Sequence, residues 1–141
     1  MTMVKIVAFI LGEEEYGVEI NHVQSIERIE HITRVPNAPM FVKGVINLRG
    51  NVIPIIDLRS KLNLGQADHT ANTRVIITKF EDIELGFIVD QTTDVIDVNP
   101  DAIEAISSSD LDSDYFGGIA KIEGRLIIML KIAELMKATT D

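Results

Sequence analysis

Short runs of alternating hydrophobic and polar residues dominate this chain, a pattern typical of β-strands. The runs are rich in Val and Ile and are bounded by turn formers such as Gly12, Pro36 and Gly50. Ten strands are predicted, at 4–11, 15–20, 29–35, 44–48, 52–58, 73–80, 84–90, 94–98, 119–122 and 125–130. Helix is expected only as one or two turns in NHVQSIERI, where Val23 and Ile26 follow a spacing of three, and as a closing helix at 132–137.

The hydrophobic pattern of residues 41–62 returns in degraded form 74 positions later. A second correspondence, at an offset of 69, covers the strands that precede this segment. Aligned pairs include Gly44 with Gly118, Gly50 with Gly124, Val52 with Leu126, Gly17 with Gly86, and Ile26 with Val95. Glycines and apolar positions are kept while polar identities change, so a unit of about 70 residues has been used twice, with turns and packing as the retained features.

Ten short strands, few helices and an internal repeat predict an all-β fold of two small five-stranded barrels packed together. An open sandwich of the same strands is the structural alternative. A half of this size would bury too little surface to be stable alone, so we expect a shared core or a wide interface. The expected organisation is one domain over 1–141, with a first barrel at 1–68, completed by the C-terminal segment, and a second at 69–141.

Charge and composition narrow the classes of partner. The chain has 13 Lys and Arg against 22 Asp and Glu, a net charge of -9, which disfavours binding to nucleic acid or anionic lipid. No apolar stretch approaches the ~20 residues that cross a bilayer. The absence of cysteine excludes disulfides and thiolate metal sites and fits a reducing compartment. We therefore expect a cytoplasmic protein with protein partners.

Catalytic and cofactor signatures are absent from the sequence. It has no phosphate-binding glycine loop, no zinc-protease motif and no serine-nucleophile motif, and its three histidines show no ligand spacing. Asp57, Asp90, Asp94 and Asp97 are the available acid and base groups, but nothing singles out a pair. No enzyme activity and no cofactor or metal are expected. A small hydrolase and a small-ligand or metal sensor remain the alternatives.

The motif KGVINLRGNVIPIIDLR contains one residue that the fold does not explain. Its apolar residues can fill a barrel and Gly50-Asn51 can make a tight turn, but Arg49 falls on Glu123 in the second copy. The turn therefore accepts either charge, and an arginine on a rigid turn is a good interface anchor. We assign Arg49 to binding.

This motif, preceded by EEYGVEINHVQSIERI and TRVPNAP and followed by LGFIVDQTTDVIDV, resembles the CheW family of bacterial chemotaxis coupling proteins. The resemblance covers about residues 4–136. It implies two five-stranded SH3-like barrels and a non-enzymatic adaptor, monomeric when isolated, that is recruited to membrane receptor arrays without membrane insertion. The implied partners are the cytoplasmic tips of methyl-accepting chemotaxis receptors and the C-terminal regulatory domain of the histidine kinase CheA. A CheW-like docking domain in another two-component pathway is the alternative.

The resemblance also implies two sets of binding residues. A receptor groove between the barrels maps to Val23, Ile26, Arg49, Ile88 and Val89. Because neighbours on a strand point to opposite faces, at most one of Ile88 and Val89 is expected to line it, and the other is expected to be buried.

Kinase contacts of the family map to Ile103, Glu104, Ile106 and Ser109. The chain departs from the usual family residues at Ser25, Glu104, Ser109 and Lys131, so charge partners there are expected to differ.

Overall fold

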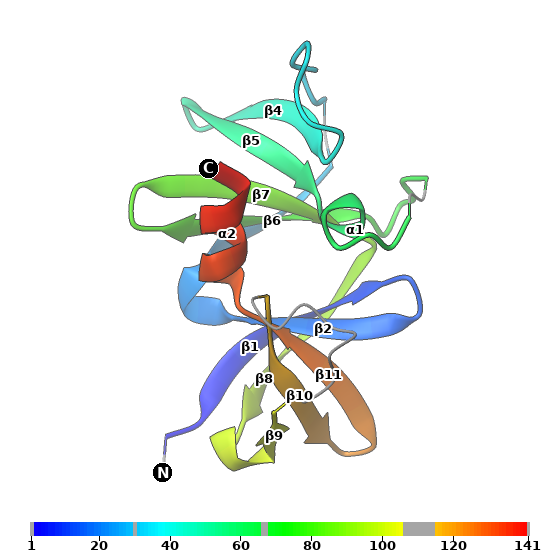
Figure 1. Ribbon diagram of the computed structural model, residues 1–141, viewed down its shortest axis with the longest axis vertical. Coiled ribbons are helices and arrows are strands. Elements are labelled where there is room, and N and C mark those ends of the chain that lie inside the picture. The colour runs from blue at the N-terminus through cyan, green and yellow to red at the C-terminus, as the bar shows by residue number, and fades with distance from the viewer. Residues whose placement is uncertain (1, 30, 66–67, 106–114, 141) are drawn as a thin grey trace. The chain divides into compact units, whose positions relative to one another are not determined.

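The computed structural model describes residues 2–29, 31–65, 68–105 and 115–140 (Figure 1). Its strands are β1 (Val4–Leu11), β2 (Glu14–Glu19), β3 (Val23–Arg28), β4 (Val42–Leu48), β5 (Asn51–Asp57), β6 (Arg74–Phe80), β7 (Ile83–Val89), β8 (Gln91–Val98), β9 (Ile103–Glu104), β10 (Phe116–Ile122) and β11 (Arg125–Leu130). The helical segments are η1 (Ile20–His22), α1 (Leu58–Lys61), η2 (Pro100–Ala102) and α2 (Ile132–Thr140). The prediction of a mostly β fold with a closing helix is confirmed.

The chain divides into two compact units, of which unit 1 combines residues 1–22 with residues 93–141. Its sheet has the strand order β8-β1-β2-β11-β10-β9, so it gains a sixth strand from the two-residue β9. Antiparallel hairpins join β1 to β2 and β10 to β11, and β2 pairs with β11 in parallel. The core cluster of this unit comprises Ile6, Val98, Ala120, Ile127 and Met129.

Unit 2 spans residues 23–92 and contains a five-stranded sheet of order β3-β6-β7-β5-β4. The hairpins β4–β5 and β6–β7 are antiparallel, and the central contact between β5 and β7 is parallel. The core cluster of this unit comprises Ile53, Ile55, Val75, Ile77 and Ile88. Each unit therefore has a core of its own, in which burying one such side chain contributes about 1.5–3 kcal/mol.

The internal repeat is visible in the pairing of the strands. In unit 1, Met129 on β11 lies opposite Gly17 on β2, and in unit 2, Ile55 on β5 lies opposite Gly86 on β7. These two pairs are related by the same offsets of 74 and 69 that align the sequence copies. The register of the central parallel contact is thus the same in both units.

The two copies exchange strands between the units. Unit 1 takes the hairpin β1–β2 from the first copy and β8, β10 and β11 from the second, whereas unit 2 takes β6–β7 from the second copy and β3, β4 and β5 from the first. The predicted subdomains 1–68 and 69–141 follow the sequence copies, so the compact units differ from them. The chain enters unit 2 at Val23 and returns to unit 1 at Thr93.

Two predicted elements in the first copy are wrong. The segment predicted as helical turns is helical only at η1, and Val23–Arg28 forms strand β3 against β6. A register shift between Val23 and Ser25 marks a bulge, yet burial alternates along the strand, with Val23 half-buried and Ile26 exposed. The apolar spacing of three therefore does not mark one face, as an amphipathic helix would require. The strand predicted at 29–35 is reduced, in its described residues, to a single bridge between Thr33 and Val45.

Helix α1 was not predicted, because the predicted strand extends to Leu58 and the polar residues Arg59 to Lys61 show no apolar spacing. Asp57 ends the strand and caps the helix: its Oδ1 accepts a hydrogen bond from the backbone N–H of Arg59 at 3.2 Å, and its Oδ2 accepts one from Ser60 Oγ at 3.0 Å. The longer α2 buries Ile132, Leu135 and Met136, a spacing of three and four that places them on one face. In the described part of the chain, no helix is both long and apolar enough to span a membrane.

Candidate functional site

The turn that carries Arg49 is a two-residue hairpin loop between β4 and β5. Leu48 pairs with Asn51, so Arg49 and Gly50 are the turn residues, rather than Gly50 and Asn51 as predicted. Both have positive φ, 53° and 87°, which is the conformation of a type I′ turn and matches the twist of the strands. Asn47 Oδ1 accepts a hydrogen bond from the backbone N–H of Gly50 at 3.2 Å and closes the loop.

The equivalent turn in unit 1 has the same backbone. Ile122 pairs with Arg125, and the loop residues Glu123 and Gly124 have φ values of 48° and 81°. A left-handed backbone costs a residue with a Cβ about 1–2 kcal/mol and favours Gly, Asn or Asp. Neither Arg49 nor Glu123 is therefore the residue that the turn prefers.

Three of the five predicted receptor contacts are accessible in the structure. Arg49 is exposed, with no hydrogen bond or ion pair from its side chain to the described residues, Ile26 is 40% exposed, and Val23 is half-buried. All three belong to unit 2. They are the part of the predicted receptor set that a partner can reach.

Ile88 and Val89, of which at most one was expected to line the groove, are both buried, at 5% and 0% exposure. Five consecutive residues of β7, from Leu85 to Val89, are buried, so both faces of this strand are covered. Ile88 belongs to the core cluster of unit 2. Neither side chain is therefore among the accessible residues of the predicted receptor set.

Apolar residues that the sequence analysis treated as packing positions are exposed at matching places in the two units. Val52 on β5 is 66% exposed and its counterpart Leu126 on β11 is 60% exposed. Ile26 on β3 has the similarly exposed counterpart Val95 on β8. In β5 the buried Ile53 and Ile55 alternate with Val52, which points to the opposite side of the strand.

The predicted kinase contacts lie at β9 in unit 1. Ile103 is half-buried and packs against the core cluster, while Glu104 is exposed and forms an ion pair with Lys121, with 3.1 Å between Oε2 and Nζ. Both residues pair with β10. Ile106 and Ser109 lie outside the described residues.

A surface pocket of about 310 Å³ adjoins Ile103 within unit 1. Its apolar wall includes Ile103, Met129 and Ile132, and polar side chains at the same site include His22, Lys131 and Glu134. A concave apolar site with a few polar groups is suited to a side chain of a partner protein. Only Ile103 of these residues was in the predicted kinase set.

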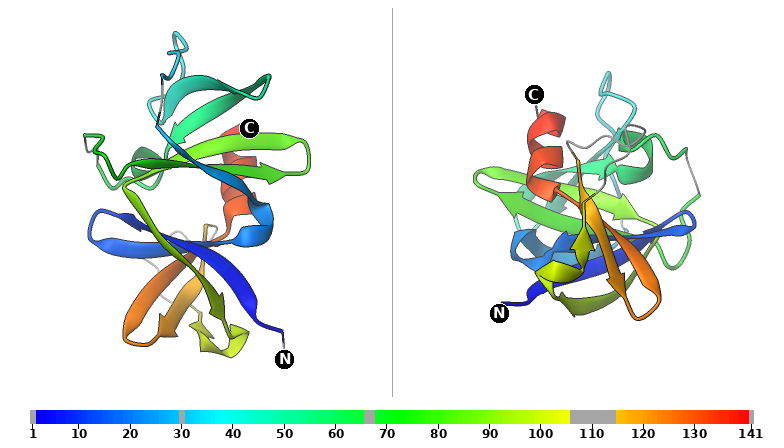
Figure 2. Two further views of the ribbon diagram at one scale, coloured as in Figure 1. Left: turned by 180° about the vertical axis from the view of Figure 1, so that it is seen from behind. Right: turned by 60° about the horizontal axis from the view of Figure 1, so that its bottom comes forward.

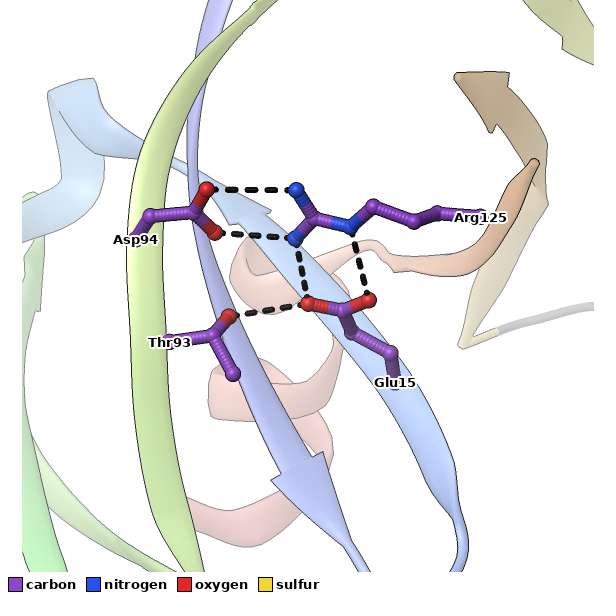
Figure 3. A network of polar contacts seen from close by, with 4 residues as sticks. All are labelled: Glu15, Thr93, Asp94 and Arg125. Atoms are coloured by element: carbon purple, nitrogen blue, oxygen red, sulfur yellow. Dashed lines mark hydrogen bonds and ion pairs between the residues drawn. The ribbon is translucent and has the colours of Figure 1, made fainter. Parts of the chain in front are cut away.

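Unit 1 also contains a network of polar side chains that links β2, β8 and β11 (Figure 3). Arg125 donates to both oxygens of Glu15, from Nε at 3.1 Å and from Nη2 at 2.6 Å, and to both oxygens of Asp94 at 3.1 and 2.8 Å. Thr93 Oγ1 donates to Glu15 Oε2 at 2.8 Å. The hydrogen bonds from Arg125 lower the pKa values of Glu15 and Asp94 below their usual values, and the hydrogen bonds to Asp94 and Glu15 raise the pKa of Arg125.

This network is specific to unit 1. In unit 2 the positions of Arg125 and Asp94 are taken by Asn51 and Ser25, so the charges that hold it together are missing. We therefore assign it to the stability of unit 1 and not to a site common to the repeat.

The four aspartates considered for acid and base catalysis each have a local partner. Asp57 caps α1, and Asp90 forms an ion pair with Arg59 at 2.7 Å. Asp94 is in the network around Arg125, and Asp97 lies 3.8 Å from Lys5. No cluster of three or more His, Cys, Asp or Glu side chains suited to a metal occurs among the described residues.

Comparisons with known proteins agree with the resemblance seen in the motif. The sequence profile of the CheW-like domain matches residues 5–140. The chemotaxis protein CheW of Bacillus subtilis (strain 168) is 42% identical over 125 residues, which are 87% of this chain and 80% of that protein. The chemotaxis protein CheW of Klebsiella aerogenes is 36% identical and covers 92% of this chain and 80% of its own length.

The crystal structure of the scaffolding protein TtCheW from Thermoanaerobacter tengcongensis has the same fold, with a TM-score of 0.86 and 36% identity over 92% of this chain and 90% of that one. This similarity confirms the all-β, SH3-like fold class. With a matching profile over almost its whole length and relatives above 30% identity, the chain belongs to the family of CheW-like domains.

Proposed function

We propose that this protein is a non-enzymatic chemotaxis adaptor that couples receptor tips to a histidine kinase of the CheA type. Its relatives carry the names of chemotaxis and scaffolding proteins, which supports a role in protein interaction. The aspartates available for acid and base chemistry are engaged in local contacts, as expected of a scaffold. Its place of action is the cytoplasmic side of a receptor array.

The proposed receptor binding rests mainly on Arg49. Its left-handed backbone makes arginine a poor choice for the turn, its side chain is exposed, and it has no ion pair within the described residues. A rigid two-residue turn presents the guanidinium with little loss of backbone freedom on binding. An arginine kept under these conditions is better explained by a partner than by the fold.

The apolar part of the receptor surface consists of Val23 and Ile26 on β3, to which we add Val52 on β5. Val23 is half-buried, Ile26 is 40% exposed and Val52 is 66% exposed, so a partner can reach all three. An apolar helical receptor tip would bury them and place a polar or acidic group against Arg49. Ile88 and Val89 are left out because they are buried.

The kinase side of the proposal rests on unit 1. Ile103 and its pocket offer a site for an apolar side chain of the kinase. The neighbouring Glu104 and its ion-pair partner Lys121 offer charged groups to the same partner. Two separate binding surfaces on one chain suffice for a scaffold, because neighbouring sites in an array raise the effective concentration of each partner. The binding free energy of each single contact can then be modest.

A matched pair of substitutions tests the role of Arg49. Arg49→Glu introduces the residue that the equivalent turn already carries in the same backbone conformation, and Glu123→Arg is the reciprocal change. Both variants should keep the melting temperature of the parent within about 2 °C, since neither changes a buried contact. Arg49→Glu should weaken binding to a purified receptor cytoplasmic fragment about tenfold or more, whereas Glu123→Arg should leave it unchanged.

The measurement is a titration of the receptor fragment by calorimetry, with the kinase regulatory domain as a second titrant. Equal affinity of the parent and Arg49→Glu for both partners would remove Arg49 from the interface. A large loss of melting temperature for Arg49→Glu alone would make its role structural. Failure of the parent to bind either partner would overturn the adaptor proposal as a whole.

A further inference from the structure

The charge of this protein is divided very unevenly between its two units. Unit 1, residues 1–22 and 93–141, has five Lys and Arg against 14 Asp and Glu, whereas unit 2, residues 23–92, has eight of each. The whole net charge of -9 therefore belongs to unit 1. Basic groups of unit 2 are consequently less screened by their own unit than the global charge suggests.

Several basic side chains of unit 2 gather around one loop, residues 32–43, which we call the basic loop. Figure 2 shows it as a long segment, in cyan, that stands out from the sheet of unit 2. Together with His69 the loop lines an open surface pocket with a volume of about 760 Å³. The basic members are Arg34, Lys43 and His69, and none of the described residues that line the surface is acidic.

Apolar side chains are exposed on the same surface. Met40 is 83% exposed, the largest value among the exposed large hydrophobic residues of the described chain, and Val35 is 44% exposed. Arg34 and His69 are also exposed, and neither has an ion pair within the described residues, while Lys43 lies 3.8 Å from Asp57. Cations beside uncovered apolar groups form a surface that is complementary to acidic and apolar groups together.

The basic loop is held at both ends by the sheet. Thr33 and Val45 exchange two backbone hydrogen bonds of 2.9 and 2.8 Å, and the N–H of Asp57 donates to the carbonyl of Phe41 at 2.7 Å. Lys61 Nζ lies 4.3 Å above the centre of the Phe41 ring. Within the loop, Pro36 and Pro39 restrict the backbone, so little conformational entropy would be lost when a partner binds.

We propose that the basic loop is a docking site for an acidic peptide segment of another protein, with an apolar side chain of that segment packed on Val35 and Met40. Carboxylates of the segment pair with Arg34, Lys43 and His69. This surface goes beyond the adaptor function proposed above, since none of its residues belongs to the receptor or kinase sets.

The charge of the whole chain favours a protein segment over the other occupants. An anionic membrane would gain about 1 kcal/mol for each basic side chain near its surface, but it would be repelled by the 14 acidic residues of unit 1. A second copy of this chain meets the same objection, because two molecules of net charge -9 repel each other. A short segment brings its acidic groups to the loop without bringing a large acidic surface.

The test is a titration of the full chain, followed by the chemical shifts of its backbone amides, with a synthetic peptide in which aspartate and glutamate flank a central leucine. Shift changes should concentrate at residues 32–43 and His69. Arg34→Glu should raise the dissociation constant of the peptide about fivefold to tenfold, and Met40→Ser should raise it about fivefold. Lys79→Glu, which makes the same charge change at an exposed position of β6, should have less than a twofold effect.

Each other outcome overturns the proposal. Equal binding of a peptide with lysine in place of its acidic residues would remove the charge argument, and shift changes elsewhere, or none, would remove the site. Shifts that depend on protein concentration without peptide would identify a second copy as the occupant. Preferential binding to vesicles of phosphatidylserine would identify a membrane. Arg49→Glu should leave peptide binding unchanged, so that failure of the adaptor proposal and failure of this one are separate results.

Discussion

Replacing Gly44 by alanine tests the close backbone contact with Thr33 that holds the base of the basic loop against β4. Gly44 lies in β4 with a φ of 148°, and a Cβ at this position would overlap the carbonyl oxygen of Thr33. That carbonyl accepts a hydrogen bond from Val45, and Thr33 returns one from its own N–H. Gly44→Ala must therefore either separate the two backbones or strain them.

The magnitude follows from these contacts. Loss of two backbone hydrogen bonds lowers the free energy of unfolding by about 2 kcal/mol. A positive φ in a residue with a Cβ lowers it by about 1–2 kcal/mol more. Gly50 is the matched control, because it also has a positive φ, 87°, but its Cβ would meet no atom within 4 Å. Gly50→Ala should lower the free energy of unfolding by about 1 kcal/mol, and Gly44→Ala should lower it by about 3–4 kcal/mol.

Urea denaturation followed by circular dichroism measures both losses, and thermal melts should fall by about 10 °C for Gly44→Ala and about 3 °C for Gly50→Ala. Gly118→Ala provides a second check in unit 1, because its φ is 127° and its Cβ would lie 2.6 Å from the carbonyl oxygen of Glu104. It should resemble Gly44→Ala. Equal losses for Gly44→Ala and Gly50→Ala would refute the close-approach reasoning and leave only the backbone conformation as the cause.

Two further predictions concern the exchange of strands and the polar network. Fragments 1–68 and 69–141, expressed separately, should be unfolded or aggregated, because each contains a hairpin of one unit and three or more strands of the other; two dispersed amide spectra with independent melts would contradict this. Arg125→Met should destabilise the protein by about 1 kcal/mol near neutral pH, a value that allows for solvent screening of these partly exposed groups. Because Arg125 lowers the folded-state pKa values of Glu15 and Asp94, this contribution is present above their ordinary values of 4.5 and 3.8 and is lost as the pH falls through the lower folded values. Denaturation of parent and variant should thus converge in acid, and a difference that grew on acidification would contradict the assignment.

The sequence by itself determined the repeat, most of the strands and, to within one residue, the hairpin turn at Gly50, because these depend on local alternation and on glycine positions. It also singled out Arg49, since comparison of the copies showed that the turn accepts glutamate at the same place. The tertiary structure decided which copy supplies which strand to each unit, because pairing between distant strands leaves no mark on local periodicity. It also made a strand of Val23–Arg28, in which Val23 is half-buried and Ile26 is exposed, so their spacing of three does not mark one face.

Exposure was likewise decided only in three dimensions. Val52, Ile26 and Ile88 are all apolar residues in strands, yet the first two are exposed and the third is buried. An apolar residue in a strand can face a core or a partner, and the sequence pattern is the same in both cases. The basic loop required the structure for the same reason, since residues 32–43 and His69 become one surface only when the chain folds.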